Sequence, residues 1–180
     1  MARLLYSAAM SLDGFIAGPG GDASWMIPYL GPNPTVDALV PQIGALLVGH
    51  RTFRGDDPYK GTEAEGKAFG GAWDGPQFVL THHPPSVPVP GVTFVGDLAS
   101  GVAAARAAAG ARYVNVLGAS IARQCLEAGL LDEILVSVLP IMLGDGVRLF
   151  GVPGGSTVRL ERVGLTHVPQ ATNLWFRVLR

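Results

Sequence analysis

The segment of residues 114–126, VNVLGASIARQCL, contains the residue types of an anion-binding turn. An apolar run ends at Leu117, the small residues Gly118, Ala119 and Ser120 follow, and a helix is expected to begin there. The first N–H groups of a helix lack partners within the helix, and the helix dipole places positive charge at the same end. A phosphate group therefore suits this turn. The alternative is that the small residues serve close packing alone.

A second turn of this kind follows the apolar run at residues 45–48. It contains His50, Arg51 and Thr52, whose cationic and hydroxyl groups suit a phosphate or an adenosine moiety. A solvated turn that carries charge is the plainer interpretation of this segment alone. Ligands gather at the carboxyl ends of parallel strands, so two such turns together favour a bound nucleotide.

Ser120 allows a different chemistry. Residues 118–122, Gly-Ala-Ser-Ile-Ala, differ by one residue from the Gly-x-Ser-x-Gly turn of serine hydrolases. Asp132 or Asp145, followed by His167, would give the chain order Ser–Asp–His of that fold. Against a triad, the chain is short for such a sheet, and His167 falls in a strand-like run rather than a loop.

Apolar runs and capping residues predict the elements that position these turns. Helices are expected from Thr35 to about Gln42, from Asp97 to Gly110, and after Gly118. Strands are expected at residues 4–10 with 14–17 as a continuation, and at 45–48, 78–81, 92–95, 114–117, 133–139, 157–165 and 173–179. Strands alternate with helices first and strands alone follow. This order predicts a mainly parallel sheet with antiparallel strands at one edge.

Composition limits the class of protein. The chain has 180 residues, of which 48% are hydrophobic, and this predicts one domain spanning residues 1–180. A net charge of −1 gives no electrostatic case for binding nucleic acid or an anionic membrane. The single cysteine, Cys125, excludes an intrachain disulfide and favours a cytoplasmic location. The apolar composition also hints at a homodimer.

No metal site is expected. The adjacent His82 and His83 would point to opposite sides of an extended segment and so cannot form a simple two-ligand site. Cys125 is expected to be a buried, inert thiol on the apolar face of its helix.

Four segments in this order resemble a known family: AAMSLDGFIAG (residues 8–18), LLVGHRT (46–52), FVLTHHP (78–84) and VLGASIARQCL (116–126). They are similar to the dihydrofolate reductase fold, and more closely to the reductase domain of the bifunctional riboflavin-biosynthesis deaminase/reductase. The resemblance covers essentially the whole chain. It implies a three-layer α/β/α fold that binds NADPH at the carboxyl edge of the sheet. It also implies hydride transfer to a C=N or C=O bond of a small heterocyclic or sugar-derived substrate.

The resemblance also implies roles for individual residues, all of them in cofactor binding. They are Ala9, Ile16 and Ala17 at the nicotinamide with Trp25 beside it, His50, Arg51, Thr52, Asp56, Thr81 and His82 at the phosphates and adenosine, and Gly118, Ala119, Ser120 and Ile121 at the pyrophosphate. NADPH rather than NADH is favoured by the family and by Arg51, His82 and His83.

The substrate side is less defined. Leu117 stands where riboflavin reductases carry a substrate-holding glutamate, so Leu117 is expected at the substrate, whose identity stays open. Asp13 is the candidate catalytic proton donor, with water as the alternative donor and an ordinary turn as the alternative role of Leu12-Asp13-Gly14. A non-catalytic nucleotide-binding module is a further alternative for the whole chain.

Overall fold

The computed structural model describes residues 1–55, 57–151, 155 and 157–180. Its strands are β1 Leu4–Ser11, β2 Phe15–Ala17, β3 Ile43–Gly49, β4 Gln77–Leu80, β5 Val92–Val95, β6 Tyr113–Leu117, β7 Glu133–Leu139, β8 Val147–Arg148, β9 Leu160–Val168 and β10 Ala171–Val178. The α-helices are α1 Pro34–Leu39, α2 His50–Phe53, α3 Leu98–Ala109 and α4 Ala119–Glu127, and the short 3-10 helices are η1 Pro19–Gly21, η2 Ser24–Tyr29, η3 Val40–Gln42 and η4 Ala68–Gly71.

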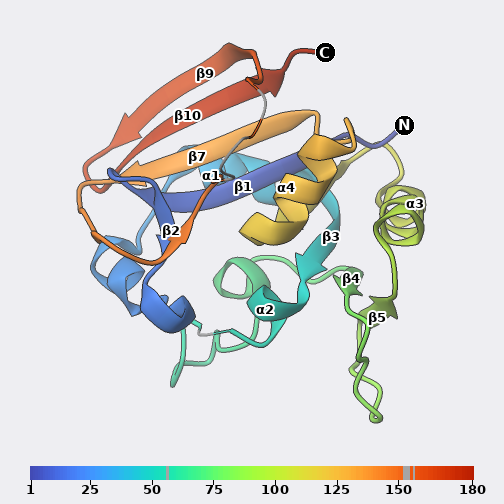
Figure 1. Ribbon diagram of the computed structural model, residues 1–180. Coiled ribbons are helices and arrows are strands. Elements are labelled where there is room, and N and C mark those ends of the chain that lie inside the picture. The colour runs from blue at the N-terminus through green and yellow to red at the C-terminus, as the bar shows by residue number, and fades with distance from the viewer. Residues whose placement is uncertain (56, 152–154, 156) are drawn as a thin grey trace.

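Eight of the strands form one sheet in the order β5-β4-β3-β6-β1-β7-β10-β9 (Figure 1). The six strands from β5 to β7 in this order are parallel to one another. β10 is antiparallel to β7, and β9 is antiparallel to β10. The expected α/β fold, with a mainly parallel sheet and antiparallel strands at its C-terminal edge, is confirmed.

Helices cover both faces of the sheet, so its central strands are apolar on both sides. β1 shows this by alternation: Leu4 and Tyr6 pack in the core shared with α3 and α4, whereas Leu5 packs with Leu39 of α1. Figure 1 shows α4 in front of the sheet and α1 behind it. These three layers are those of the dihydrofolate reductase-like fold.

Helix α3 follows its sequence signals closely. The Asp97 carboxylate accepts a hydrogen bond from the Ser100 N–H (2.9 Å), and this capping bond lowers the pKa of Asp97. Gly110 ends the helix with φ at 64°. A Cβ atom on Gly44 of β3 would lie 2.5 Å from the Ala109 carbonyl oxygen, so glycine at this position allows the helix to lie close against the sheet.

The sequence expectations differ from the structure at three places. β2 does not continue β1, because the turn at Gly14 (φ 94°) directs it into a separate two-stranded sheet with β8. Asn33, not Thr35, caps α1: its side-chain oxygen accepts from the Thr35 N–H (3.3 Å), and the buried Asn33 also pairs with Asn173 of β10. The strand expected at residues 157–165 is β9, Leu160–Val168.

Cys125 is fully buried on the core face of α4, and burial raises the pKa of its thiol to about 11. This agrees with an inert thiol. Within the described part of the chain, no helix has the length and apolar character needed to cross a membrane.

Candidate functional site

The junction between β6 and α4 leaves backbone amides without partners inside the helix at the carboxyl edge of the sheet. β6 ends at Leu117, and Gly118 takes a positive φ of 107°, a conformation that strains any other L residue. Gly118 is the N-cap of α4 and supplies no side-chain capping bond. Its carbonyl accepts from the Ala122 N–H (3.1 Å), so the N–H groups of Ala119, Ser120 and Ile121 precede the first helical hydrogen bond. Helix geometry therefore leaves three donors available to an anion.

The turn after β3 touches the turn after β6. A Cβ atom on Gly118 would overlap the Thr52 hydroxyl oxygen, and a Cβ atom on Gly49 would lie 3.6 Å from Ile121 Cγ2. This proximity arises because β3 and β6 are paired neighbours, from Ile43↔Tyr113 to Val48↔Leu117. The structure therefore brings together two of the turns predicted to bind the cofactor.

His50 carries an unsatisfied polar atom beside these turns. Its ring is half-buried, and its Nδ1 is buried without a hydrogen-bond partner among the described residues. Arg51 and Thr52, next along α2, are exposed. A buried ring nitrogen without a partner costs free energy unless a ligand or water satisfies it. Together with the uncapped start of α4, this donor set fits the phosphate-rich part of a dinucleotide.

The predicted nicotinamide residues lie at the end of β1 and on β2. Ala9 packs against a small cluster formed by the buried Trp25, Leu139 and Ala171. The Trp25 indole Nε1 is buried and has no partner among the described residues. Ile16 and Ala17 are half-buried on β2. β1 pairs with β6 from Leu4↔Val114 to Tyr6↔Val116, so Ala9 lies on the strand next to the one that leads into α4.

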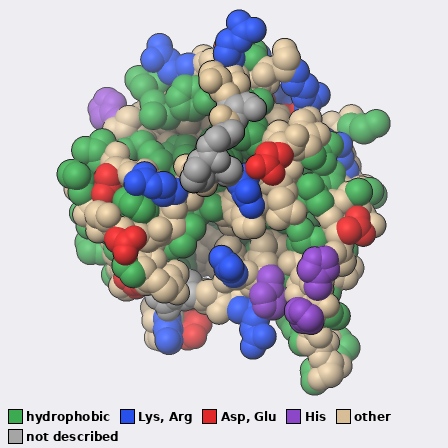
Figure 2. Space-filling view, in the orientation of Figure 1, with side chains coloured by type: hydrophobic (Ala, Val, Ile, Leu, Met, Phe, Trp, Pro, Cys, Tyr) green, Lys and Arg blue, Asp and Glu red, His purple; other side chains and the backbone are tan. Residues whose placement is uncertain are grey.

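The predicted adenosine residues extend the site to β4, on the other side of β3. Thr81 is buried at the end of β4, and its hydroxyl accepts from the His83 N–H (3.1 Å), while His82 is exposed. Figure 2 shows histidine side chains gathered with Lys or Arg side chains over α2 and the segment after β4. This edge of the molecule thus carries cationic groups suited to phosphate. The predicted cofactor residue Asp56 lies outside the described residues.

Asp13 is held by three hydrogen bonds. Its Oδ1 accepts from the Ser11 hydroxyl (2.6 Å) and the Leu143 N–H (3.0 Å), and its Oδ2 accepts from the Gly144 N–H (2.7 Å). The Ser11 bond, with the two amides in support, lowers the pKa of Asp13 to about 2. The carboxylate is therefore ionised at neutral pH and already has donors on both oxygens.

Leu117 is half-buried at the end of β6 and packs against the core on the α1 side of the sheet. Two residues earlier, on the same face, Asn115 is fully buried. Neither polar atom of its amide has a partner among the described residues. Sequence reasoning missed Asn115 and the unpaired nitrogen of His50, because a pattern of residue types does not show which polar atoms lack partners.

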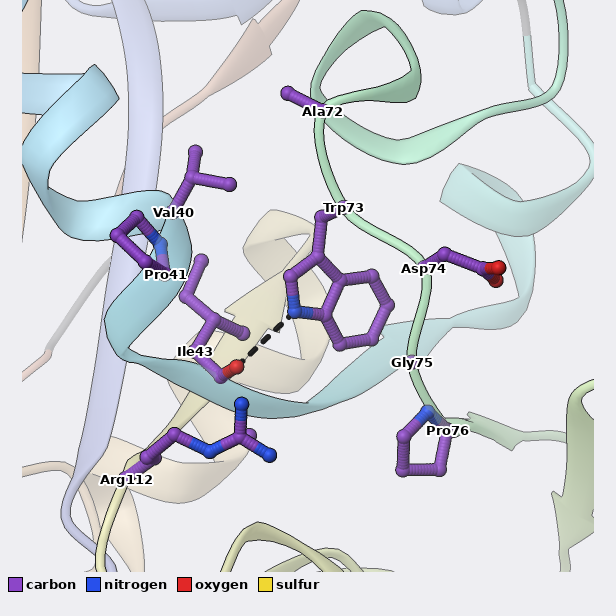
Figure 3. Close-up of a pocket in the computed structure, with 10 residues that line it drawn as sticks. Val40, Pro41, Ile43, Ala72, Trp73, Asp74, Gly75, Pro76 and Arg112 are labelled. Atoms are coloured by element: carbon purple, nitrogen blue, oxygen red, sulfur yellow. Dashed lines mark hydrogen bonds between the residues drawn. The ribbon is translucent and has the colours of Figure 1, made fainter.

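Two cavities lie at the opposite edge of the sheet. One of about 300 Å³ is lined by Val40, Ile43, Trp73 and Arg112, with the Trp73 indole donating to the Ile43 carbonyl (3.1 Å; Figure 3). Another, of about 290 Å³, lies beside Asp132. Both adjoin the amino ends of strands, so neither is the site formed by the turns described above.

The residues considered for a serine hydrolase are far apart. Ser120 follows β6, whereas His167 lies on β9, four strands away, which corresponds to about 19 Å at the usual strand spacing. Asp132 precedes β7 at the amino edge and accepts from the Leu4 N–H (2.9 Å) and the Arg180 guanidinium (2.8 Å). These residues therefore do not form a triad.

Comparison with known proteins identifies relatives across almost the whole chain. The family model of the RibD C-terminal domain matches residues 2–174. A provisionally named riboflavin biosynthesis protein from Shewanella sp. PV-4 is similar in structure, with 26% identity, a TM-score of 0.75 and 100% of both chains covered. The uncharacterized protein YyaP of Bacillus subtilis is 24% identical over 156 residues, covering 82% of this chain and 80% of that protein.

A larger enzyme shares the fold. The diaminohydroxyphosphoribosylaminopyrimidine deaminase/5-amino-6-(5-phosphoribosylamino)uracil reductase of Thermotoga maritima superposes with a TM-score of 0.69 at 18% identity. The match covers 99% of this chain and 57% of that one.

Proposed function

The chain belongs to the RibD C-terminal domain family, and on that premise we propose that it is an NADPH-dependent reductase. In this proposal it transfers hydride to a C=N or C=O bond of a small heterocyclic or sugar-derived substrate. The observation that carries the proposal is the contact between the Gly118 turn and Thr52, next to His50, whose buried Nδ1 has no partner in the described part of the chain. Two turns of a parallel sheet that meet in this way suit one extended phosphate ligand.

Each group of residues has a distinct task in this proposal. The amides of Ala119, Ser120 and Ile121 bind the pyrophosphate, since they are the N–H groups that α4 leaves without partners. His50, Arg51 and Thr52, with Asp56, Thr81 and His82, hold the phosphates and the adenosine.

The protein positions the reacting ring and excludes water from it. Ala9, Ile16 and Ala17 provide the surface for the nicotinamide, and Trp25 provides a buried indole N–H beside them. When bound, NADPH supplies the hydride. The chain itself contributes orientation: it holds the nicotinamide ring and the substrate next to each other, so that hydride transfer takes place within one complex.

The residues proposed to face the substrate are apolar. Leu117 presents an alkyl group, and the cluster that contains Trp25 adds Met26, Ile141 and Leu143. An aliphatic residue at position 117 cannot form an ion pair or a charge-assisted hydrogen bond with the substrate. We therefore place at this point a neutral part of the substrate.

Titration with NADPH tests the proposal. Binding should quench tryptophan fluorescence, because Trp25 lies beside the proposed ring site, and should raise the melting temperature with cofactor concentration. The Arg51→Ala variant should bind NADPH more weakly, with a smaller effect on NADH, since NADPH carries one more phosphate. No binding at millimolar NADPH would refute the proposal.

Turnover separates a reductase from a module that only binds nucleotides. NADPH oxidation, followed by absorbance across a panel of cyclic imines and carbonyl compounds, should identify at least one active compound. Binding without any turnover would favour the non-catalytic alternative. The expected homodimer stays a prediction that sedimentation or size-exclusion measurements test.

A further inference from the structure

Two loops leave the sheet side by side at the carboxyl edge. The first, residues 12–18, follows β1, and the second, residues 140–149, follows β7. β1 and β7 are parallel and paired from Leu5↔Glu133 to Ser11↔Leu139, so both loops begin at the same level. The first loop includes β2, which carries Ile16 and Ala17 of the proposed nicotinamide site.

The Asp13 side chain joins the two loops. It accepts hydrogen bonds from the Leu143 and Gly144 amides of the second loop, at 3.0 and 2.7 Å. The buried Ser11 fixes the carboxylate from the other side: its hydroxyl donates to Asp13 Oδ1 (2.6 Å) and accepts from the Phe15 N–H (3.0 Å). A carboxylate held by three donors forms strong, charge-assisted hydrogen bonds that fix its orientation.

Other contacts keep the loops folded beside this carboxylate. The Leu12 N–H donates to the Ile141 carbonyl (2.8 Å), and the Leu149 N–H donates to the Gly14 carbonyl (2.9 Å). The Arg148 guanidinium lies 4.6 Å from the centre of the Phe15 ring. Removal of the Asp13 carboxylate therefore leaves a paired ribbon and releases chiefly the 143–144 segment.

We infer that Asp13 is a positioning residue for hydride transfer: by holding Leu143 and Gly144 against the β1 loop, it fixes one side of the proposed nicotinamide and substrate site. This inference rests on the proposed reductase function. Leu143 packs against the same cluster as Ala9, around Trp25, so its backbone position affects the packing beside the proposed nicotinamide site. The proton that completes the reduction then comes from water, since the Asp13 oxygens are occupied as acceptors.

The Asp13→Asn variant tests the inference, because it keeps the shape but replaces one acceptor oxygen by an N–H donor that faces a donor. The Leu143 and Gly144 amides should exchange hydrogen at least about tenfold faster, as the hydrogen bonds that protect them weaken. The kcat/KM should fall about tenfold to a hundredfold. The pH profile of kcat/KM between pH 5 and 9 should keep its shape, because Asp13 is ionised throughout that range.

The Asp13→Glu variant provides a second test of the inference. It keeps a carboxyl group but displaces it by one methylene, so it cannot reproduce both bonds to the 143–144 amides. A positioning role predicts faster amide exchange and a loss of kcat/KM similar to those of Asp13→Asn. Asp74→Asn, the same chemical change at an exposed residue on the opposite edge, should alter neither quantity.

Three outcomes would overturn the inference. Unchanged exchange at Leu143 and Gly144 would show that the carboxylate does not hold the loop. A changed acidic limb of the pH profile in Asp13→Asn, with activity retained in Asp13→Glu, would indicate proton donation. If neither variant folds, Asp13 supports the whole domain rather than two loops. Amide exchange does not need cofactor, so failure of the reductase proposal is seen separately, as absent NADPH binding in the unaltered protein.

Discussion

Replacement of Gly118 by alanine is the most direct test of the proposed cofactor turn. Gly118 has a φ of 107°, and an L residue held in such a conformation costs about 1–2 kcal/mol. The new methyl group would also overlap the Thr52 hydroxyl oxygen, and the Thr52 Cβ would lie 3.4 Å away. Turning Thr52 away from its rotamer costs about another 1 kcal/mol. The variant should therefore lose about 2–3 kcal/mol of unfolding free energy and about 4–12 °C in melting temperature.

The two contributions can be separated by a double-mutant cycle with Thr52→Ala. That substitution removes the hydroxyl oxygen with which the methyl group overlaps, so Gly118→Ala in the Thr52→Ala background should cost only the backbone strain, about 1–2 kcal/mol. The coupling free energy between the two positions is then about 1 kcal/mol. Urea denaturation of the four proteins measures it, provided that the m-values agree.

Cofactor binding gives the functional readout of the same variant. Alanine at position 118 pushes the β3 and β6 turns apart, so the Kd for NADPH should rise at least about tenfold. Gly96→Ala is the matched control: a Cβ atom there meets nothing within 4 Å, and both stability and affinity should stay close to those of the unaltered protein. A Gly118→Ala protein that binds NADPH normally would refute the assignment of this turn.

Three further predictions concern the rest of the fold. Gly44→Ala should destabilise the protein by at least about 3 kcal/mol in urea denaturation, because its Cβ would lie 2.5 Å from the Ala109 carbonyl oxygen and backbone must move. Asn115→Leu should stabilise it by about 1–2 kcal/mol in the same assay, since neither polar atom of the buried amide has a partner among the residues that the structure describes. A loss of stability would indicate a bound water or ligand at that amide. Native Cys125 should resist alkylation at pH 8 and react after denaturation. Burial raises the pKa of the Cys125 thiol in the folded protein to about 11, so the thiol of the unfolded chain ionises at a lower pH. The free energy of unfolding should therefore decline as the pH rises from about 9 towards 11.

The fold was predictable where local signals agree with the tertiary contacts. Asp97 and Gly110 bound α3 in the sequence and in the structure, because a cap acts through bonds within four residues of it. The cap of α1 was predicted at the wrong residue. Asn33 rather than Thr35 occupies the N-cap position of α1, because the Asn33 side chain also exchanges two hydrogen bonds of 3.0 Å with Asn173, a partner 140 residues away. No local pattern contains that information.

The arrangement of the turns was predictable for a different reason. The carboxyl ends of parallel strands gather at one edge, so turns after β3 and β6 must be neighbours once these strands pair. No comparable rule of sheet geometry predicts that the Asp13 side chain bonds to the amides of residues 143–144. The residues around it, Ser11 to Gly14, are those of an ordinary turn, and the donors of the second loop are backbone amides, which any sequence would supply.

The cofactor is easier to infer than the substrate, because the proposed cofactor site depends on backbone and strand order and the proposed substrate site depends on individual side chains. The proposed pyrophosphate site consists of backbone N–H groups and the positive φ of Gly118, so it survives extensive change in side chains as long as that glycine and the strand order persist. The proposed substrate side consists of side chains such as Leu117 and Leu143, each of which a single substitution can alter. At 24–26% identity, we therefore expect relatives to share the proposed pyrophosphate site, which is built from backbone, more closely than the proposed substrate site, which is built from side chains. The substrate is better sought through the shape and polarity of the side chains proposed to lie beside it, such as Leu117 and Leu143, than through the names of relatives.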